Sequence, residues 1–341
     1  MSSVPGQIVL VTGATGFLGR RVVRRLAEAG TPVRALVRPG APEDVLAACL
    51  EGISNARVEI APASFGDDDA LRRAVDGAAV ILHVAASKSG SAASQVANTV
   101  VGSERLFRAA IDAGRPRVVL VSSFGVIGSA QAPRLSTIDE STPMDPHPEW
   151  RDAYSFTKHR QETLAWSYFR DLGLPLVVVR PAPIFGPGQP LLVARVGLSA
   201  FGWFLHLGGG NTVPLTYVDN CADAVVQAGV APGIEGEIFC VVDDDLPTSR
   251  QVLKLYRRRV GGIRVLPVPF MVLRRLAAIN AWYSRRTHNH LPPVFTPYKV
   301  DTMWKPQRYS NAKAKSRLGW TPRVPMHEAL DRTIAAVGRP S

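Results

Sequence analysis

Cysteine is scarce in this chain of 341 residues, which holds only Cys49, Cys221 and Cys240. These three share no close spacing, and this excludes a disulfide scaffold and a zinc site built from clustered cysteines. The histidines show no ligand spacing beside acidic residues. We therefore expect no bound metal and a reducing, cytoplasmic environment.

Long uncharged apolar runs are also missing, so we expect no membrane-spanning helix. The nearest candidate, Leu191–Gly210, is interrupted by Arg195 and His206. This stretch either walls an apolar pocket or packs in a core, and core packing is the simpler interpretation. The N-terminal residues lack a basic segment followed by a long apolar one, so we expect no signal peptide.

Acidic residues are few at the C-terminal end. Residues 250–341 hold 19 Lys and Arg against 3 Asp and Glu, whereas residues 1–249 hold 21 against 25. Such asymmetry indicates either an anionic partner or a solvated basic surface. We expect no nucleic-acid partner, because no nucleic-acid-binding motif accompanies the charge.

Phe270–Trp282 is apolar but contains Arg274 and Arg275. We favour a solvated helix there over one lying on a membrane.

Short apolar runs alternate with helical stretches through the first 180 residues. Runs without strict alternation are typical of strands buried on both faces of a parallel sheet. The expected strands are Ile8–Thr12, Val33–Val37, Arg57–Ile60, Ala79–Val84, Val118–Ser122 and Leu176–Arg180. The expected helices lie near 17–29, 67–75, 94–112 and 153–171. This alternation predicts an α/β fold with a doubly wound parallel sheet.

The rhythm changes after Arg180, where Pro181–Pro190 contains four prolines and reads as a loop. We therefore divide the chain into a first domain of residues 1–180 and a smaller, mixed α/β second domain of residues 181–341. The segment near 211–245 contains a candidate strand, Ile238–Val242, that can return to the first sheet.

A glycine-rich turn follows the first expected strand and opens the first expected helix, with glycines at Gly13, Gly16 and Gly19. In this position, Gly13 allows a tight turn, Gly16 lets the backbone approach a pyrophosphate, and Gly19 permits close helix packing. The free N–H groups at the helix start favour phosphate binding. The turn predicts a dinucleotide site.

The second expected strand indicates which dinucleotide binds. An acidic residue at its end typically binds the ribose 2′-hydroxyl of NAD, whereas an arginine accommodates the 2′-phosphate of NADP. Here the strand ends in Arg38 and has no acid. We therefore expect NADP(H) to be favoured over NAD(H).

Tyr154 and Lys158 are spaced i and i+4, which places both on one face of an expected helix. A nearby ammonium lowers the pKa of a phenol, so that the phenol can exchange a proton with an alcohol oxygen. Ser123 ends an expected strand about thirty residues earlier and can hold the reacting oxygen beside Tyr154. A second pair, Tyr309 and Lys313, lacks such a strand and is set aside.

On these motifs the chain resembles the extended short-chain dehydrogenase/reductase superfamily, in particular its NAD-dependent epimerase/dehydratase-like group, which has a Rossmann sheet. Thr12–Gly19 is similar to the glycine motif of that superfamily. Ser123, Tyr154 and Lys158 are similar to its catalytic triad, and Asn98 to an asparagine that supports the catalytic lysine through a water. The resemblance implies an NADP(H)-binding first domain and a mainly substrate-binding second domain.

Further landmarks extend the resemblance over nearly the whole chain. They are His83–Ala86, Arg180–Gly188, Val218–Ala224 and Lys313–Trp320. The cofactor contacts that the motifs and the resemblance imply are Gly13, Thr15, Gly16, Phe17, Leu18, Gly19, Arg38, Ser64, Phe65, Ala85, Ala86, Tyr154, Lys158, Pro181 and Ile184.

Departures from the superfamily narrow the expected chemistry. Phe124 and Gly125 stand where sugar-nucleotide dehydratases carry Asp and Glu. Pro183 stands where hexose epimerases usually have asparagine, and Ser64 where an acid that touches adenine is common. The pattern is more similar to the 3β-hydroxysteroid dehydrogenase and dihydroflavonol reductase branches, which act on apolar ketones or alcohols.

We therefore expect an NADP(H)-dependent oxidoreductase that interconverts a secondary alcohol and a ketone on a fairly apolar small molecule, with Tyr154 as acid/base. A nucleotide-sugar epimerase or reductase is the alternative, because the basic C-terminal third suits a diphosphate. A cofactor-binding regulator without activity is a third possibility, which the intact Ser123, Tyr154 and Lys158 set opposes. A homodimer remains open.

Overall fold

A computed structural model describes residues 7–41, 44–200, 202–287 and 295–337. Its centre is a parallel sheet with the spatial order β12-β7-β5-β4-β1-β2-β3. In chain order the strands are β1 (Ile8–Thr12), β2 (Val33–Val37), β3 (Val58–Pro62), β4 (Ala78–His83), β5 (Arg117–Val121), β7 (Leu176–Pro181) and β12 (Ile238–Val241). This Rossmann-type sheet confirms the fold predicted from the sequence.

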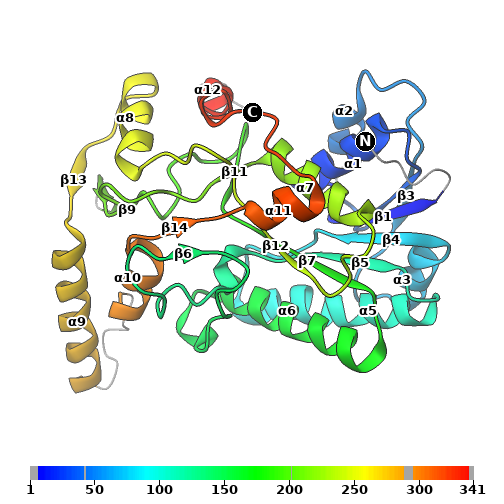
Figure 1. The fold of residues 1–341 in the computed structure, drawn as a ribbon, viewed down its shortest axis with the longest axis horizontal. Helices are drawn as coiled ribbons and strands as arrows, with labels where there is room; N and C mark the ends of the chain where they lie inside the picture. The colour runs from blue at the N-terminus through cyan, green and yellow to red at the C-terminus, as the bar shows by residue number, and fades with distance from the viewer. Residues whose placement is uncertain (1–6, 42–43, 201, 288–294, 338–341) are drawn as a thin grey trace.

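Helices cover both faces of this sheet (Figure 1). One face carries α3 (Asp68–Val75), α5 (Gly102–Asp112) and α6 (Ala153–Leu172), and the other carries α1 (Gly19–Glu28), α7 (Val218–Val230) and α11 (Ala312–Leu318). The strand side chains divide between two cores. Val11 packs in the core with Val22 of α1 and Val225 of α7, whereas its neighbour Leu10 packs in the core with Leu106 of α5. Successive strand side chains point to opposite faces, so both faces must be apolar.

The carboxyl ends of β1, β4 and β5 lie side by side. Thr12 at the end of β1 is opposite His83 at the end of β4, and His83 is opposite Leu120 near the end of β5. Strand β1 lies between β4 and β2, so the chain changes direction across the sheet at β1. Ligands of open α/β sheets bind in the crevice at such a switch point, beside the carboxyl ends of the strands.

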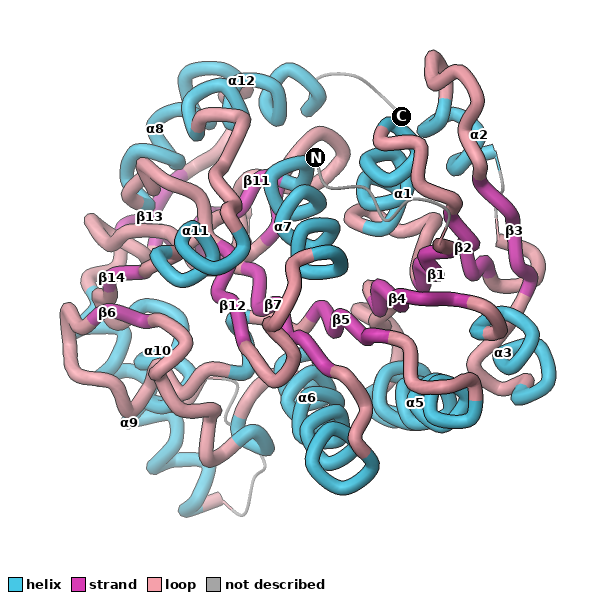
Figure 2. Tube along the Cα trace, turned by 45° about the vertical axis from the view of Figure 1, so that its right-hand side comes forward, coloured by secondary structure: helices cyan, strands magenta, loops and turns pink. Residues whose placement is uncertain are grey.

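Smaller sheets and the helices α8 (Ser249–Arg259), α9 (Phe270–Arg286), α10 (Pro297–Trp304) and α12 (Met326–Val337) gather beyond β12 (Figure 2). One sheet has the order β13-β10-β9, and two pairs are β11-β8 and β14-β6. Their bounds are β6 (Thr137–Ile138), β8 (Ile184–Phe185), β9 (Gly197–Ala200), β10 (Trp203–His206), β11 (Thr216–Tyr217), β13 (Val265–Pro267) and β14 (Arg308–Tyr309).

Leu191–Gly210 forms β9, β10 and their connections, and several of its apolar side chains are buried. Leu191, Val196 and Phe204 belong to the main core, whereas Trp203 is exposed. In the described part of the chain, no helix is long and apolar enough to cross a membrane.

The observed elements differ from the sequence-based expectation mainly in the helices. The expected helix at 94–112 consists of α4 (Ala92–Val96), a π-helical turn η1 (Ala97–Val101) and α5. Helix α2 (Asp44–Leu50) was not expected, and it buries only Leu46 of its seven residues. One buried side chain gives a weak periodic signal, which explains why the sequence pattern did not indicate this helix.

Candidate active site

The glycine turn after β1 packs so tightly that side chains have no room. Gly13 has φ +68°, and a Cβ there would lie 2.9 Å from Cα of Ala85. A Cβ on Gly19 would lie 1.9 Å from the carbonyl oxygen of Gly13. Gly16 is exposed, whereas Leu18 is buried beneath the turn. The turn therefore presents bare backbone at the start of α1, where an anion can approach the free N–H groups.

The loop after β7 closes over this turn. A Cβ on Gly186 would lie 3.3 Å from the ring of Phe17. Pro181 ends β7 and is buried, and Ile184 begins β8 and is half-buried. The structure thus brings the glycine turn and the segment 181–186 to one side of the crevice.

The other expected cofactor contacts flank the turn. Arg38 directly follows β2, is exposed, and makes no side-chain hydrogen bond or ion pair with another described residue. Ser64 accepts a hydrogen bond from the Gly66 N–H at 3.2 Å, and the Phe65 ring meets the His83 ring edge-on at 5.8 Å. Arg38 is therefore free to bind an anion, whereas Phe65 packs against the buried strand β4.

A buried chain of hydrogen bonds crosses from the end of β1 to α6. Thr12 Oγ1 lies 2.7 Å from Nδ1 of His83, and Nε2 of His83 lies 2.8 Å from Ser103 Oγ. Gln161 donates through Nε2 to Ser103 Oγ at 2.7 Å. Lys158 Nζ donates to Oε1 of Gln161 at 2.8 Å. Each of these side chains is buried, so this chain holds the lysine of α6 rigidly against the sheet.

The pKa values in the site depend mainly on burial. Burial lowers the pKa of Lys158 to about 7, with a further contribution from the nearby Lys88 cation, while Glu162 raises it. Burial raises the pKa of Tyr154 to about 12, against a hydrogen bond with the Ser123 side chain that lowers it. The expectation of an acidified phenol is therefore wrong for the protein by itself. Removing the charged phenolate from water raises the pKa by more than the hydrogen bond with Ser123 lowers it.

The direct contacts of Lys158 are a backbone carbonyl and a glutamine side chain. Its ammonium donates to the Val121 carbonyl oxygen at 2.6 Å as well as to Gln161. Asn98, expected to support it through a water, is exposed on η1 and donates from Nδ2 to the Ser94 carbonyl oxygen at 2.9 Å. In the described structure, Gln161 is the side chain that fixes Lys158 directly.

Two residues of the site were not found from the sequence. Gln161 follows Lys158 by three positions, a spacing that places both on one helix face, and this was the available signal. Lys88, five residues after His83, holds its ammonium 5.9 Å from the centre of the Tyr154 ring. This second cation in the crevice can bind an anionic group of a cofactor or substrate.

Helix α6 is anchored at its start and along its length. Asp152 caps the helix, accepting from the Ser155 N–H at 3.0 Å and from the Ser155 hydroxyl at 2.7 Å. Glu162 binds the fully buried Arg180 of β7 at 2.6 Å and accepts from Ser122 at 2.5 Å. These contacts fix the helix that carries Tyr154 against the carboxyl ends of the strands.

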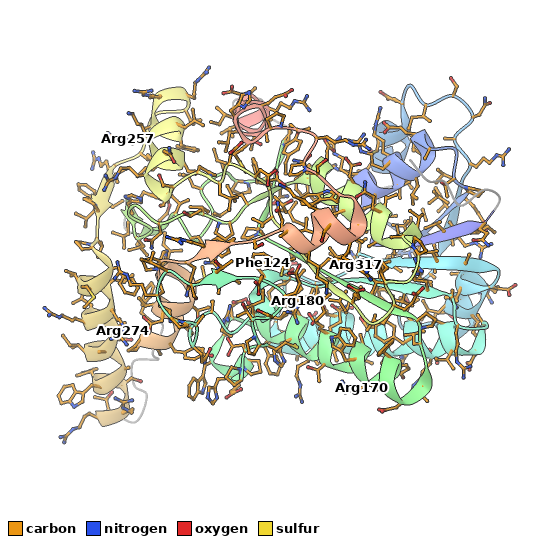
Figure 3. All side chains as sticks on the ribbon, in the orientation of Figure 1. Phe124, Arg170, Arg180, Arg257, Arg274 and Arg317 are labelled. Carbon is orange, nitrogen blue, oxygen red and sulfur yellow. The ribbon has the colours of Figure 1, made fainter. Side chains whose placement is uncertain are left out.

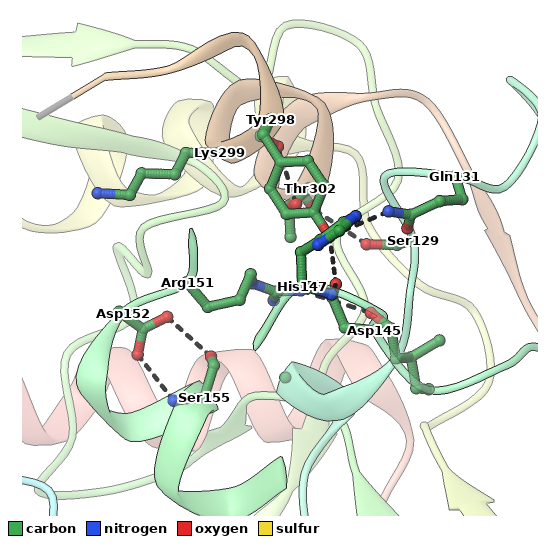
Figure 4. A network of polar contacts seen from close by, with 12 residues as sticks. Ser129, Gln131, Asp145, His147, Arg151, Asp152, Ser155, Tyr298, Lys299 and Thr302 are labelled. Atoms are coloured by element: carbon green, nitrogen blue, oxygen red, sulfur yellow. Dashed lines mark hydrogen bonds and ion pairs between the residues drawn. The ribbon is translucent and has the colours of Figure 1, made fainter. Parts of the chain in front are cut away.

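The segment before α6 is tied to α10 by a polar network (Figure 4). Tyr298 of α10 donates to Asp145, and Gln131 donates to the Tyr298 hydroxyl at 3.0 Å. Arg151 donates to the buried carboxylate of Asp145 at 2.5 Å. Helix α10 therefore helps to hold the segment before α6 in place.

The described residues contain no group of three or more His, Cys, Asp or Glu side chains that could hold a metal ion. The polar side chains that the structure places around the crevice are Ser123, Tyr154, Lys88 and Lys158, near the glycine turn.

Comparison with known proteins gives a consistent result. Residues 9–241 match the family model described as the NAD dependent epimerase/dehydratase family. The 3beta-hydroxysteroid-dehydrogenase/decarboxylase isoform 1 of Arabidopsis thaliana is 27% identical over 352 residues, covering 95% of this chain and 78% of that protein. The 2-alkyl-3-oxoalkanoate reductase of Stenotrophomonas maltophilia (strain K279a) is 29% identical over 341 residues, covering 96% and 98%.

A solved structure agrees over the full length. The crystal structure of gox2253 superimposes with a TM-score of 0.78 at 25% identity, covering 98% of this chain and 100% of that one. The match therefore extends beyond the parallel sheet to the smaller sheets and helices of the C-terminal part.

Proposed function

The chain belongs to the NAD dependent epimerase/dehydratase family, and on that basis we propose that it interconverts a secondary alcohol and a ketone on a fairly apolar substrate. It is an NAD(P)-dependent oxidoreductase of the extended short-chain dehydrogenase/reductase type. The observation that carries the proposal is the gathering of Ser123, Tyr154 and Lys158 beside β5, with Lys158 linked by buried hydrogen bonds to the end of β1.

The residues at the crevice fit a dinucleotide. The turn has no space for a side chain at Gly13 or Gly19, leaves backbone exposed at Gly16, and would hold the pyrophosphate. Arg38 after β2, which has no side-chain partner among the described residues, favours the 2′-phosphate of NADP(H) over the 2′-hydroxyl of NAD(H). Ala85, which packs directly against Gly13 of the turn, and the next residue, Ala86, would line the site with small side chains. The nicotinamide supplies or accepts the hydride.

The protein residues move the proton and hold the reacting oxygen. Tyr154 is protonated near neutral pH because burial raises its pKa to about 12, so it can donate a proton from Oη to a ketone oxygen as hydride arrives at the carbon. Ser123, in hydrogen-bond contact with Tyr154, positions that oxygen. Lys158 ties α6 to the end of β5 through its hydrogen bond to the Val121 carbonyl oxygen. Because its pKa is lowered to about 7, its side chain changes between the charged and the neutral form near neutral pH.

The relatives support an apolar substrate. The names of two of them describe a hydroxysteroid and an alkyl oxoalkanoate, which are a largely apolar alcohol and a largely apolar ketone. Pro183, in place of an asparagine near a sugar-nucleotide phosphate, favours the same class.

A test of this function follows the absorbance of NADPH with a panel of lipophilic ketones. We expect net consumption of NADPH by the wild-type protein, and a loss of about 100-fold or more in kcat for Tyr154→Phe with cofactor binding retained. Undiminished turnover by that variant removes Tyr154 as the acid. Isomerisation of a nucleotide sugar without net consumption identifies an epimerase, and cofactor binding without any turnover identifies a regulator.

Four finer features belong to the same proposal. They are the preference for NADP(H), a cytoplasmic location, an arrangement as a homodimer, and the division at residue 180 with the strand near 238–242 returning to the first sheet. The pairing of β12 with β7 supports the last of these.

A further inference from the structure

One helix presents a large apolar surface to solvent. Six side chains of α9 are between 45% and 60% exposed, and together they form what we name the α9 apolar face: Met271, Val272, Leu276, Ile279, Trp282 and Tyr283. On the other side of α9, Leu273, Ala277 and Ser284 are buried. Isolated apolar side chains on a surface are ordinary, but a contiguous set on one helix indicates a binding surface.

The charges on α9 are all positive. Its sequence contains four arginines and no acid. Arg274 is paired with Asp301 of α10 on the flank of the helix. Arg275 and Arg286 are exposed on the same side as the α9 apolar face, and the Arg286 guanidinium lies 5.6 Å from the centre of the Trp282 ring. Long arginine side chains among apolar and aromatic residues are typical of helices at a membrane–water interface.

The neighbouring helix adds further positive charge on the same edge of the molecule. Helix α8 presents exposed basic residues beside a shallow groove, and β13 connects α8 to α9 (Figure 1). Figure 3 shows Arg257 of α8 and Arg274 of α9 along this edge. The basic residues of α8 are Arg250, Lys254, Arg257, Arg258 and Arg259. Of these, Arg259 lies 3.6 Å from the carboxylate of Asp331.

The sequence pattern favours a solvated helix here; from the exposed apolar face and the charges beside it, we propose instead that the α9 apolar face docks on the surface of an anionic phospholipid bilayer, with the basic residues of α8 and α9 against the lipid phosphates. Apolar burial and attraction of each cation to anionic lipid would act together. A second copy of this chain fits less well, because a symmetric contact would bring together Arg275 and Arg286 of two copies, for which the described residues offer no acidic partner. The helix lies on the bilayer and does not cross it. This inference does not depend on which substrate the enzyme takes.

The test measures sedimentation of the purified full chain with vesicles. We expect the protein to bind vesicles of phosphatidylcholine with about 30% phosphatidylglycerol, to bind pure phosphatidylcholine vesicles much less, and to be released by added salt. The double variant Leu276→Asp/Ile279→Asp should lower binding by about tenfold or more. Both side chains are exposed, so the variant should keep its melting temperature.

A control uses Leu172→Asp, which changes a leucine that is 46% exposed at the end of α6, and it should bind vesicles as the wild type does. Failure of the wild type to bind anionic vesicles overturns the proposal, and so does binding that is insensitive to lipid charge. A dimer in solution that the double variant dissociates, without vesicle binding, shows instead that the face joins two copies.

Discussion

Gln161 holds Lys158 from one turn further along α6: its Oε1 accepts from the lysine Nζ at 2.8 Å, while its Nε2 donates to Ser103 at 2.7 Å. The same Nε2 lies 3.2 Å from the ring of His83. One amide thus joins the lysine of the helix to the end of β4. A glutamine suits this place because it is donor and acceptor at once, which a carboxylate or an ammonium is not.

Replacing Gln161 by leucine should lower the free energy of unfolding by about 1–3 kcal/mol, because Lys158 and Ser103 each lose a partner in a buried place. Urea unfolding at pH 7 measures this. Gln131→Leu is the control, since the amide of Gln131 is exposed and bonds only Tyr298 among the described residues. Equal stability of the two variants would show that the buried chain of hydrogen bonds does not stabilise the fold.

The sequence allowed the parallel sheet and the glycine turn to be predicted, because both depend on local patterns. Buried strands such as β1 are short apolar runs, and Gly13 has an obligatory left-handed φ. The contact of Gln161 with His83 joins positions 78 residues apart, and no local pattern encodes it. The pKa of Tyr154 could not be predicted either. Its direction is set by how far the folded chain removes the phenol from water, and spacing in the sequence does not show that.

Arg38→Asp should change the cofactor preference. The wild type is expected to favour NADPH, and the variant should shift the ratio of kcat/KM for NADPH over NADH toward NADH by about 10–100-fold, the range of a charge-assisted hydrogen bond. Steady-state kinetics with both cofactors measure the ratio. Arg57→Asp makes the same change of charge just before β3, at the amino ends of the strands and away from the cofactor crevice. It should leave the ratio unchanged. An equal shift in both variants would assign the effect to net charge.

Glu162→Ala should destabilise the protein by about 3–5 kcal/mol, because it leaves the fully buried guanidinium of Arg180 without its carboxylate. Thermal or urea unfolding measures the loss. Glu328→Ala breaks an exposed pair with Arg332 on α12 and should cost no more than about 1 kcal/mol. A similarly small loss in both variants would mean that water reaches Arg180 and replaces the lost carboxylate.

Lys158→Met should change the pH dependence of stability. Burial lowers the pKa of Lys158 to about 7 in the folded protein, whereas the unfolded chain keeps its lysines protonated up to about pH 10.4. Between these values the unfolded state binds one more proton than the native state. This lysine therefore makes the free energy of unfolding rise with pH by up to about 1.4 kcal/mol per unit. Below pH 7 both states are protonated, and the cost of burying the charge is fully present.

The variant lacks this contribution. Its free energy of unfolding, relative to that of the wild type, should therefore be most favourable below pH 7, and the difference should shrink steadily toward pH 10. Urea unfolding of both proteins at pH 6, 7, 8 and 9 gives the difference, in which the other titrating groups largely cancel. Lys254→Met, at an exposed position of α8, should give a difference that does not vary with pH. A difference that is equally flat for Lys158→Met would mean that the ammonium remains charged across this range, held by Val121 and Gln161 strongly enough to offset its burial.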